Sequence, residues 1–257
     1  LLLKRRALVA KLKPPRWACR MNRFARVAVE AVALVATPVV LVACAIANVE
    51  QTALLSFVVV LASIGVFFAT YEASRPRLRD IMPTVVLAAL AAAGRILFAP
   101  IPDFKPVSAI AIIAGVVFGR RSGFMVGALA ALVSNFFFGQ GPWTPWQMYA
   151  WGLVGYGAGL LAGVGAGDKR LVDAHPSVVY AYGFVSCLGY GLILNAWSIL
   201  AFFHAQASGW AGILAVYAAA LPFDITHGVA TVAFLLVLYA PWVKKLRRVR
   251  VKFGLAG

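Results

Sequence analysis

Long apolar runs alternate with short polar or basic segments along most of the chain. A run of about 20 apolar residues is long enough to cross the hydrocarbon core of a bilayer as an α-helix. The pattern predicts eight such spans, at residues 27–47, 52–71, 83–99, 107–118, 123–138, 146–166, 177–203 and 222–240. The fourth is too short to cross an untilted bilayer alone. The predicted fold class is therefore an all-α integral membrane protein.

The amino-acid composition agrees with this fold class. Hydrophobic residues make up 63% of the 257 residues, charged residues make up only 12%, and the mean hydropathy is +0.89. A soluble domain of this length does not need so much apolar sequence. The net charge of +16 would favour nucleic acid if the basic residues covered a surface. They cluster between apolar runs instead, so we expect the lipid bilayer, and no nucleic acid, as a partner.

The basic residues also predict the orientation in the membrane. If eight spans alternate in direction, the segments on one side are residues 1–26, 72–82, 119–122, 167–176 and 241–257. These five segments hold 22 of the 24 Lys and Arg residues. Because cytoplasmic segments of membrane proteins carry an excess of Lys and Arg, we predict that both termini are cytoplasmic.

A charged, proline-containing segment between residues 72 and 80 divides the spans into two groups. We expect a basic cytoplasmic arm at 1–26, a two-helix appendage at 27–74, a core of six spans at 80–240 and a basic cytoplasmic tail at 241–257. Glu30 is expected at the cytoplasmic interface, where its charge costs little. Residues 205–221 are expected to form an external connection, apolar enough to lie as a short interfacial helix.

An unusually polar segment at residues 134–148 joins two of the core spans. Its Gly and Pro residues prevent a helix from running through it. We therefore predict an irregular loop at the outer rim of the membrane. The loop and its flanks carry Asn135, Gln140, Trp143, Trp146 and Gln147.

Six polar residues in the core spans fall at a similar depth, in the outer half of the predicted membrane. Polar groups in lipid are costly unless they find partners, so we predict that the six share one cavity open to the outside. Aromatic residues at this level would stack on a planar ligand. With neighbours from the 134–148 segment, the predicted substrate-binding residues are Arg95, Phe104, Asn135, Gln140, Trp143, Trp146, Gln147, Asn195, Asp224 and His227.

A structural alternative stays open for the same residues. In it, Arg95 and Asp224 form an internal ion pair, which is a common fate of charges inside membranes, and the amides cap helix ends. The two interpretations are compatible, because such a pair can also orient a ligand.

The first core span carries two pairs of alanines at i, i+4 spacing, Ala88 with Ala92 and Ala89 with Ala93. Small residues at this spacing let another helix approach closely, and close packing is what associates helices in lipid. The pairs are predicted to pack either inside the chain or against a partner.

The sequence lacks the common catalytic motifs. It contains no H-E-x-x-H, no G-x-S-x-G and no P-loop, and its three cysteines show no metal-ligand spacing. We therefore expect a protein that is not an enzyme and that has no catalytic residue, cofactor or metal of its own. The alternative is an integral-membrane enzyme or assembly factor that acts on a lipid-linked substrate through Arg95, Asp224 and His227.

Four stretches of the core resemble the substrate-binding (S) components of energy-coupling factor (ECF) transporters, closest to the group that includes cobalamin carriers. They are Phe104-Lys105-Pro106, Gly119 to Gly123, the segment at 134–148, and Leu221 to Asp224. The resemblance covers residues 80–240 and is most specific in the 134–148 segment.

This resemblance implies a six-helix bundle in a bacterial plasma membrane, here preceded by two additional N-terminal transmembrane helices that most members lack. It implies capture of a vitamin or vitamin precursor from outside the cell, with cobalamin as the best guess. The implied partners are a transmembrane scaffold subunit and two ATPase subunits, which complete an importer of the ABC type. The family's alanine-x-x-x-alanine motif contacts the scaffold, and it falls here on Ala88 and Ala92 or on Ala89 and Ala93.

Overall fold

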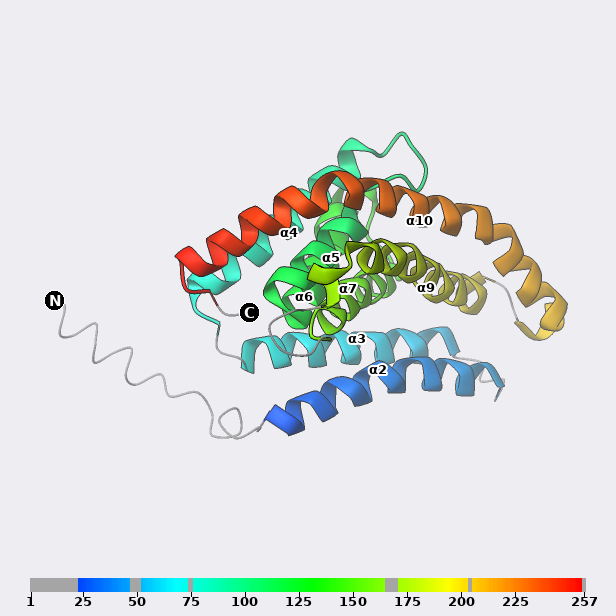
Figure 1. The fold of residues 1–257 in the computed structure, drawn as a ribbon. Helices are drawn as coiled ribbons and strands as arrows, with labels where there is room; N and C mark the ends of the chain where they lie inside the picture. The colour runs from blue at the N-terminus through cyan, green and yellow to red at the C-terminus, as the bar shows by residue number, and fades with distance from the viewer. Residues whose placement is uncertain (1–22, 47–51, 74–75, 165–170, 203–204, 256–257) are drawn as a thin grey trace.

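The chain folds into α-helices and short connections throughout the part that the computed structural model describes, residues 23–46, 52–73, 76–164, 171–202 and 205–255 (Figure 1). The helices are α2 (Arg23–Ile46), α3 (Thr52–Ala73), α4 (Leu78–Leu97), α5 (Val107–Phe118), α6 (Arg120–Phe138), α7 (Thr144–Leu161), α8 (Leu171–Ala174), α9 (Pro176–Phe202) and α10 (Ala205–Lys252). The predicted all-α fold class is confirmed. Most of the basic arm predicted at 1–26 lies outside the described residues.

The eight predicted spans correspond in order to α2, α3, α4, α5, α6, α7, α9 and α10. Four of the described helices, α4, α6, α9 and α10, are long and apolar enough to cross a membrane. Helix α5 has only 12 residues, as its short apolar run predicts, and all of them are buried. It packs against α4, α6, α7, α9 and α10. Because these helices surround it, α5 does not have to be long enough to span the bilayer.

Helix α10 corrects one prediction. Residues 205–221 are not a separate interfacial helix, because the helix that ends at Lys252 continues unbroken through residues 210–221. The non-helical Gly209 (φ 57°, ψ −169°) marks a kink between it and the short stretch that begins at Ala205. Pro222, where the sequence places the start of the last span, lies inside this helix. Proline removes one backbone donor, and the helix continues past it, with the Thr226 hydroxyl donating to the Pro222 carbonyl at 2.8 Å.

Helices α6 and α7 pack with their backbones in contact. Gly123 on α6 and Gly155 on α7 face each other so closely that a Cβ atom on either would collide with the carbonyl oxygen of the other. Because glycine has no Cβ atom, the two backbones approach more closely than other residues allow. This contact lies near the start of α6, at the end away from the loop that joins α6 to α7.

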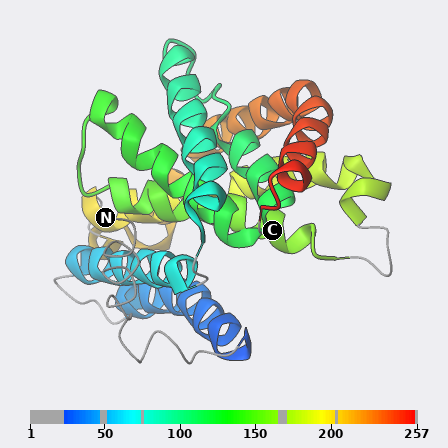
Figure 2. The ribbon, with the colours of Figure 1, turned by 90° about the vertical axis from the view of Figure 1, so that its left-hand side faces the viewer.

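Helices α2 and α3 lie side by side along one flank of the bundle (Figures 1 and 2). Between them, Thr37 Oγ1 and Ser63 Oγ are 2.5 Å apart. Phe67 on α3 stacks on Phe124 of α6, with ring centroids 4.0 Å apart. Helix α3 therefore packs directly on the core.

Glu30 on α2 is buried in the protein and paired, while its predicted depth at the cytoplasmic interface stays a prediction. Its side chain is fully buried and forms salt bridges with Arg120 at 3.0 Å and Arg121 at 2.6 Å. The Tyr156 hydroxyl also donates to Glu30 Oε2 at 2.8 Å. A carboxylate is buried only at high cost unless it is paired and hydrogen-bonded. The two arginines at the start of α6 supply this pairing, and they attach α2 directly to the core.

Candidate functional site: a polar network around Arg95

Arg95 lies in the last turn of α4 and is almost fully buried, with 9% of its surface exposed. Its Nη1 atom donates to Ser134 Oγ and to Asn135 Oδ1, each at 2.7 Å. Both acceptors are on α6, near its C-terminal end. Two hydrogen bonds from one nitrogen therefore connect the C-terminal ends of α4 and α6.

Two aromatic rings lie against the Arg95 guanidinium. Its Cζ atom is 4.7 Å from the centroid of the Phe138 ring and 4.9 Å from the centroid of the Trp151 ring. Contact with an aromatic face stabilises a cation, and more strongly at the buried Trp151 than at Phe138, which is 44% exposed. Together with the two hydrogen bonds, these rings hold the guanidinium in one orientation.

Asn135 is the centre of the network, and its side chain is buried. Its Oδ1 atom accepts from Arg95, while its Nδ2 atom donates to Thr144 Oγ1 at 3.0 Å and to Gln147 Oε1 at 2.9 Å. Thr144 and Gln147 begin α7, so this one amide joins the end of α6 to the start of α7. Three of the residues predicted for the site, Arg95, Asn135 and Gln147, thus lie in one hydrogen-bonded network.

Gln140 ties the loop between α6 and α7 back onto α6. Its Oε1 atom accepts from the Thr144 hydroxyl at 2.9 Å, and its Nε2 atom donates to the Leu132 carbonyl at 2.9 Å. Because Gln140 is exposed, its amide orders the loop at the surface. This arrangement agrees with the structural role that one alternative gives to the amides.

A second polar cluster also contacts Trp151. The indole Nε1 of Trp151 donates to Ser108 Oγ at 3.2 Å, and Ser108 Oγ is also 2.9 Å from His227 Nε2. The Tyr190 ring packs against both Trp151 and His227, with centroids 4.8 and 5.0 Å apart. Residues of α5, α7, α9 and α10 are thereby linked to a ring that supports Arg95.

Asn195 and Asp224 form a separate contact between α9 and α10, in which Asn195 Nδ2 donates to Asp224 Oδ2 at 3.2 Å. Among the described residues no salt bridge joins Arg95 to Asp224, so the ion pair expected in one alternative is wrong. Asp103, on the loop before α5, interacts electrostatically with Arg95, Asp224 and His227.

The aromatic residues predicted for the site take different positions. Phe104 packs against Phe98 and Phe234, with ring centroids 5.7 and 5.0 Å apart. Trp146 is buried in the core, whereas Trp143 is 38% exposed at the N-cap of α7. The rings that support the guanidinium are thus not the ones predicted from the sequence.

Sequence reasoning missed Ser108, Thr144 and Trp151. Ser108 is the only hydroxyl residue in the apolar run at 107–118, and that isolation was a usable signal. Thr144 lies inside the polar segment already singled out. Trp151 gave no signal, because a tryptophan in an apolar helix is usually part of the core.

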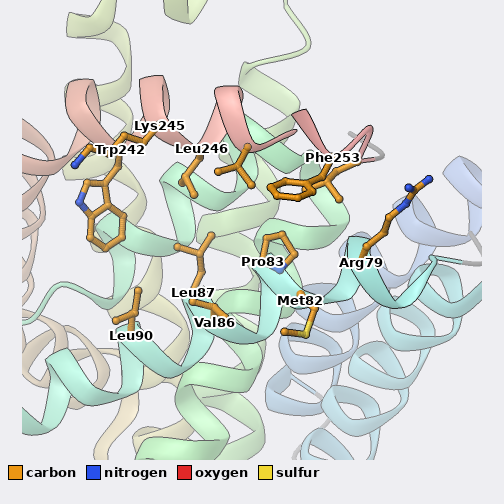
Figure 3. Close-up of a pocket in the computed structure, with 12 residues that line it drawn as sticks. Arg79, Met82, Pro83, Val86, Leu87, Leu90, Trp242, Lys245, Leu246 and Phe253 are labelled. Atoms are coloured by element: carbon orange, nitrogen blue, oxygen red, sulfur yellow. The ribbon is translucent and has the colours of Figure 1, made fainter. Parts of the chain in front are cut away.

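An apolar groove with a volume of about 510 Å³ lies apart from the network, between the start of α4 and the end of α10 (Figure 3). Helix α4 contributes Met82, Val86 and Leu90, and α10 contributes Trp242 and Leu246. An apolar groove of this kind favours a hydrophobic partner over a polar solute.

The two alanine pairs on α4 face in different directions. Ala88 and Ala92 are buried, whereas Ala89 and Ala93 are exposed. Since α4 packs on α5 and α6, the first pair serves contacts inside the chain. The second pair is left for lipid or for another protein.

Length, composition and helical structure together define a helical protein of the membrane class, with four described helices able to cross a bilayer. The chain belongs to the family of unknown function DUF6580, whose model matches residues 74–250. The match begins just before α4 and ends within α10, so it includes the whole Arg95 network. No curated protein and no solved structure matches the chain.

Proposed function

We propose that this chain is the substrate-capture subunit of an ECF-type importer. It binds a vitamin or vitamin precursor, with cobalamin as the best guess, from outside the cell. The observation that carries the proposal is a nearly buried arginine, Arg95, held by Ser134 and Asn135 at 2.7 Å within an otherwise apolar bundle. Ionisable residues inside membrane segments are rare and commonly mark the path or site of a solute.

Two charged clusters at opposite ends of α6 support the proposed orientation. Arg120 and Arg121, which pair with Glu30, begin α6, and Asn135 lies near its end. A rise of 1.5 Å per residue puts Asn135 about 21 Å from Arg121 along the helix axis, about two-thirds of the roughly 30 Å hydrocarbon core of a bilayer. We assign the Glu30 cluster to the cytoplasmic side, together with the basic segments, and the Arg95 network to the outer side.

In this arrangement α4, α5, α6, α7, α9 and α10 form a six-helix core in a bacterial plasma membrane. Helices α2 and α3 are two additional spans, and both termini are cytoplasmic. The 22 basic residues in the five segments that eight alternating spans would put on one side support this topology.

Transport requires an energy source, and we assign it to separate chains. The scaffold subunit, which carries two ATPase subunits, docks on the face of α4 that points away from the bundle and includes Ala89 and Ala93. Their exposure supports this assignment, because small residues on a free helix face allow another helix to pack closely. The apolar groove beside Met82 and Val86 extends the same surface with room for a hydrophobic segment of the scaffold.

Binding of labelled cobalamin to the purified protein in nanodiscs tests the proposal, with riboflavin, folate, thiamine and biotin as comparisons. We expect saturable binding of at least one of these solutes. If none of them binds saturably to correctly folded protein, the capture function is wrong.

The enzyme alternative needs Arg95, Asp224 and His227 to act together. Asp224 bonds to Asn195 and His227 to Ser108, so the three side chains have separate partners. No hydrogen bond or salt bridge joins any two of them in the described part of the chain, so no contact supports a joint catalytic role. Turnover of a lipid-linked substrate without any ATPase partner, abolished by Asp224→Asn while affinity is retained, would support the enzyme instead.

A further inference from the structure

The positive charge of Arg95 is not neutralised by any carboxylate in the described part of the chain. The five salt bridges among the described residues do not include Arg95. Glu30, by contrast, is a buried charge that the chain pairs with two of its own arginines. Asp103 is the carboxylate that interacts with Arg95 electrostatically, but it forms its own salt bridge with Lys105 at 3.1 Å. A buried cation in this state is expensive.

Only one nitrogen of the guanidinium is used. Nη1 makes both hydrogen bonds, to Ser134 and Asn135, and Nε and Nη2 make none with the described residues. A guanidinium carries five N–H donors in a planar fork. The rings of Phe138 and Trp151 hold that plane, so the unused edge is presented in a fixed direction.

A planar fork of N–H donors matches the paired oxygens of a carboxylate or a phosphate. We propose that the captured solute carries such an anionic group and that Arg95 binds it through Nε and Nη2. This inference rests on the proposed capture function, because it names the chemistry of the captured solute. The anionic group supplies the neutralising charge that the chain itself lacks at this position.

The test uses the full chain in nanodiscs and pairs of solutes that differ in one anionic group. Suitable pairs are biotin and biotinamide, pyridoxal phosphate and pyridoxal, riboflavin phosphate and riboflavin, and cobinamide phosphate and cobinamide. Each pair is titrated against the unmodified protein, Arg95→Gln, Arg95→Lys and Arg79→Gln. Arg79 lies on the same helix at its opposite end and serves as the matched control.

In the pair that the protein recognises, we expect the anionic member to bind at least about tenfold more tightly. Arg95→Gln brings the two members to within about twofold, Arg95→Lys keeps part of the preference as a point charge, and Arg79→Gln keeps all of it. Thermal unfolding without solute checks that each variant folds. If Arg95→Gln does not fold, the inference is judged by whether the unmodified protein prefers the anionic member of the pair.

Two other results have different meanings. Saturable binding without preference for the anionic member, or a preference that survives in Arg95→Gln, overturns this inference and leaves the capture function standing. Absence of saturable binding for every solute overturns the capture function, and this inference with it.

Discussion

The Nη1 atom of Arg95 lies 2.7 Å from the Oδ1 atom of Asn135, a residue 40 positions away in the sequence. This contact closes the ends of α4 and α6 on each other, and the other amide atom of Asn135 extends it to Thr144 and Gln147 on α7. Three helix ends are therefore held together by one side chain. Because it supports the orientation of Arg95, Asn135 is a positioning residue for the proposed solute.

Asn135→Ala removes an acceptor from Arg95 and a donor from Thr144 and Gln147, all of them in a sparsely hydrated site. Leaving such groups unpaired costs about 1–3 kcal/mol. We expect a lower unfolding temperature and solute affinity weakened by about tenfold or more, with insertion into the membrane retained. Thr226→Ala is the control, since its exposed hydroxyl bonds only to a carbonyl of its own helix. If Asn135→Ala binds the solute with unchanged affinity, the hydrogen-bonded network does not contribute to solute binding.

Glu30→Gln tests the attachment of α2 to the core. The substitution leaves Arg120 and Arg121 without their carboxylate, but both arginines are about a quarter exposed, so solvent reduces the loss. We expect destabilisation of about 2 kcal/mol in chemical unfolding, below the value for fully buried pairs.

The control is Glu72→Gln, an exposed position on α3, which should be nearly neutral. Solute affinity should stay unchanged in both variants, because the Glu30 cluster lies about 21 Å from Asn135 by the helix rise. Equal stability of Glu30→Gln and Glu72→Gln would mean that the buried cluster does not attach α2.

Gly155→Ala tests the backbone contact between α6 and α7. The added methyl group meets the Gly123 carbonyl, so the helices must separate, which costs about 1–3 kcal/mol. Gly189→Ala is matched to it, because a Cβ atom there meets nothing within 4 Å. That variant should be more stable by about 0.5–1 kcal/mol through helix propensity. Thermal unfolding of the two variants should therefore move in opposite directions.

The two alanine pairs on α4 separate folding from partner docking. Ala89→Trp places a large side chain on an exposed surface, so we expect normal folding and solute binding but loss of co-purification with an ATPase pair. Ala92→Trp overpacks the interior and should destabilise the protein by about 3 kcal/mol. If Ala89→Trp still co-purifies with the ATPase pair, docking occurs on another surface.

The helices could be predicted from the sequence because their signals are local. Apolar length set the spans, and the Gly and Pro residues after Phe138 predicted the loop before α7, with Gln147 on the first turn. The same logic failed at Pro222, where the sequence placed the start of the last span. A proline inside a helix removes one backbone hydrogen bond but does not have to end the helix. There α10 continues, with Thr226 bonded to the Pro222 carbonyl.

Side-chain partners could not be predicted in the same way. Depth in the membrane placed Arg95, Asn135 and Asp224 at one level, but whether Arg95 meets an amide or a carboxylate depends on how α4 is rotated against α6 and α10. Glu30 shows the same limit: its position near the cytoplasmic end was readable, whereas its burial against Arg121 required the packing of α2 on the core. Helix rotation and register are set by contacts distant in sequence, such as the Gly123–Gly155 approach.

An experimental structure of the protein saturated with its solute tests the central claim most directly. The account predicts density for the solute within hydrogen-bonding distance of Arg95 Nε or Nη2, next to the Trp151 ring. Solute bound in the groove between α4 and α10, with the Arg95 fork unoccupied, would contradict it.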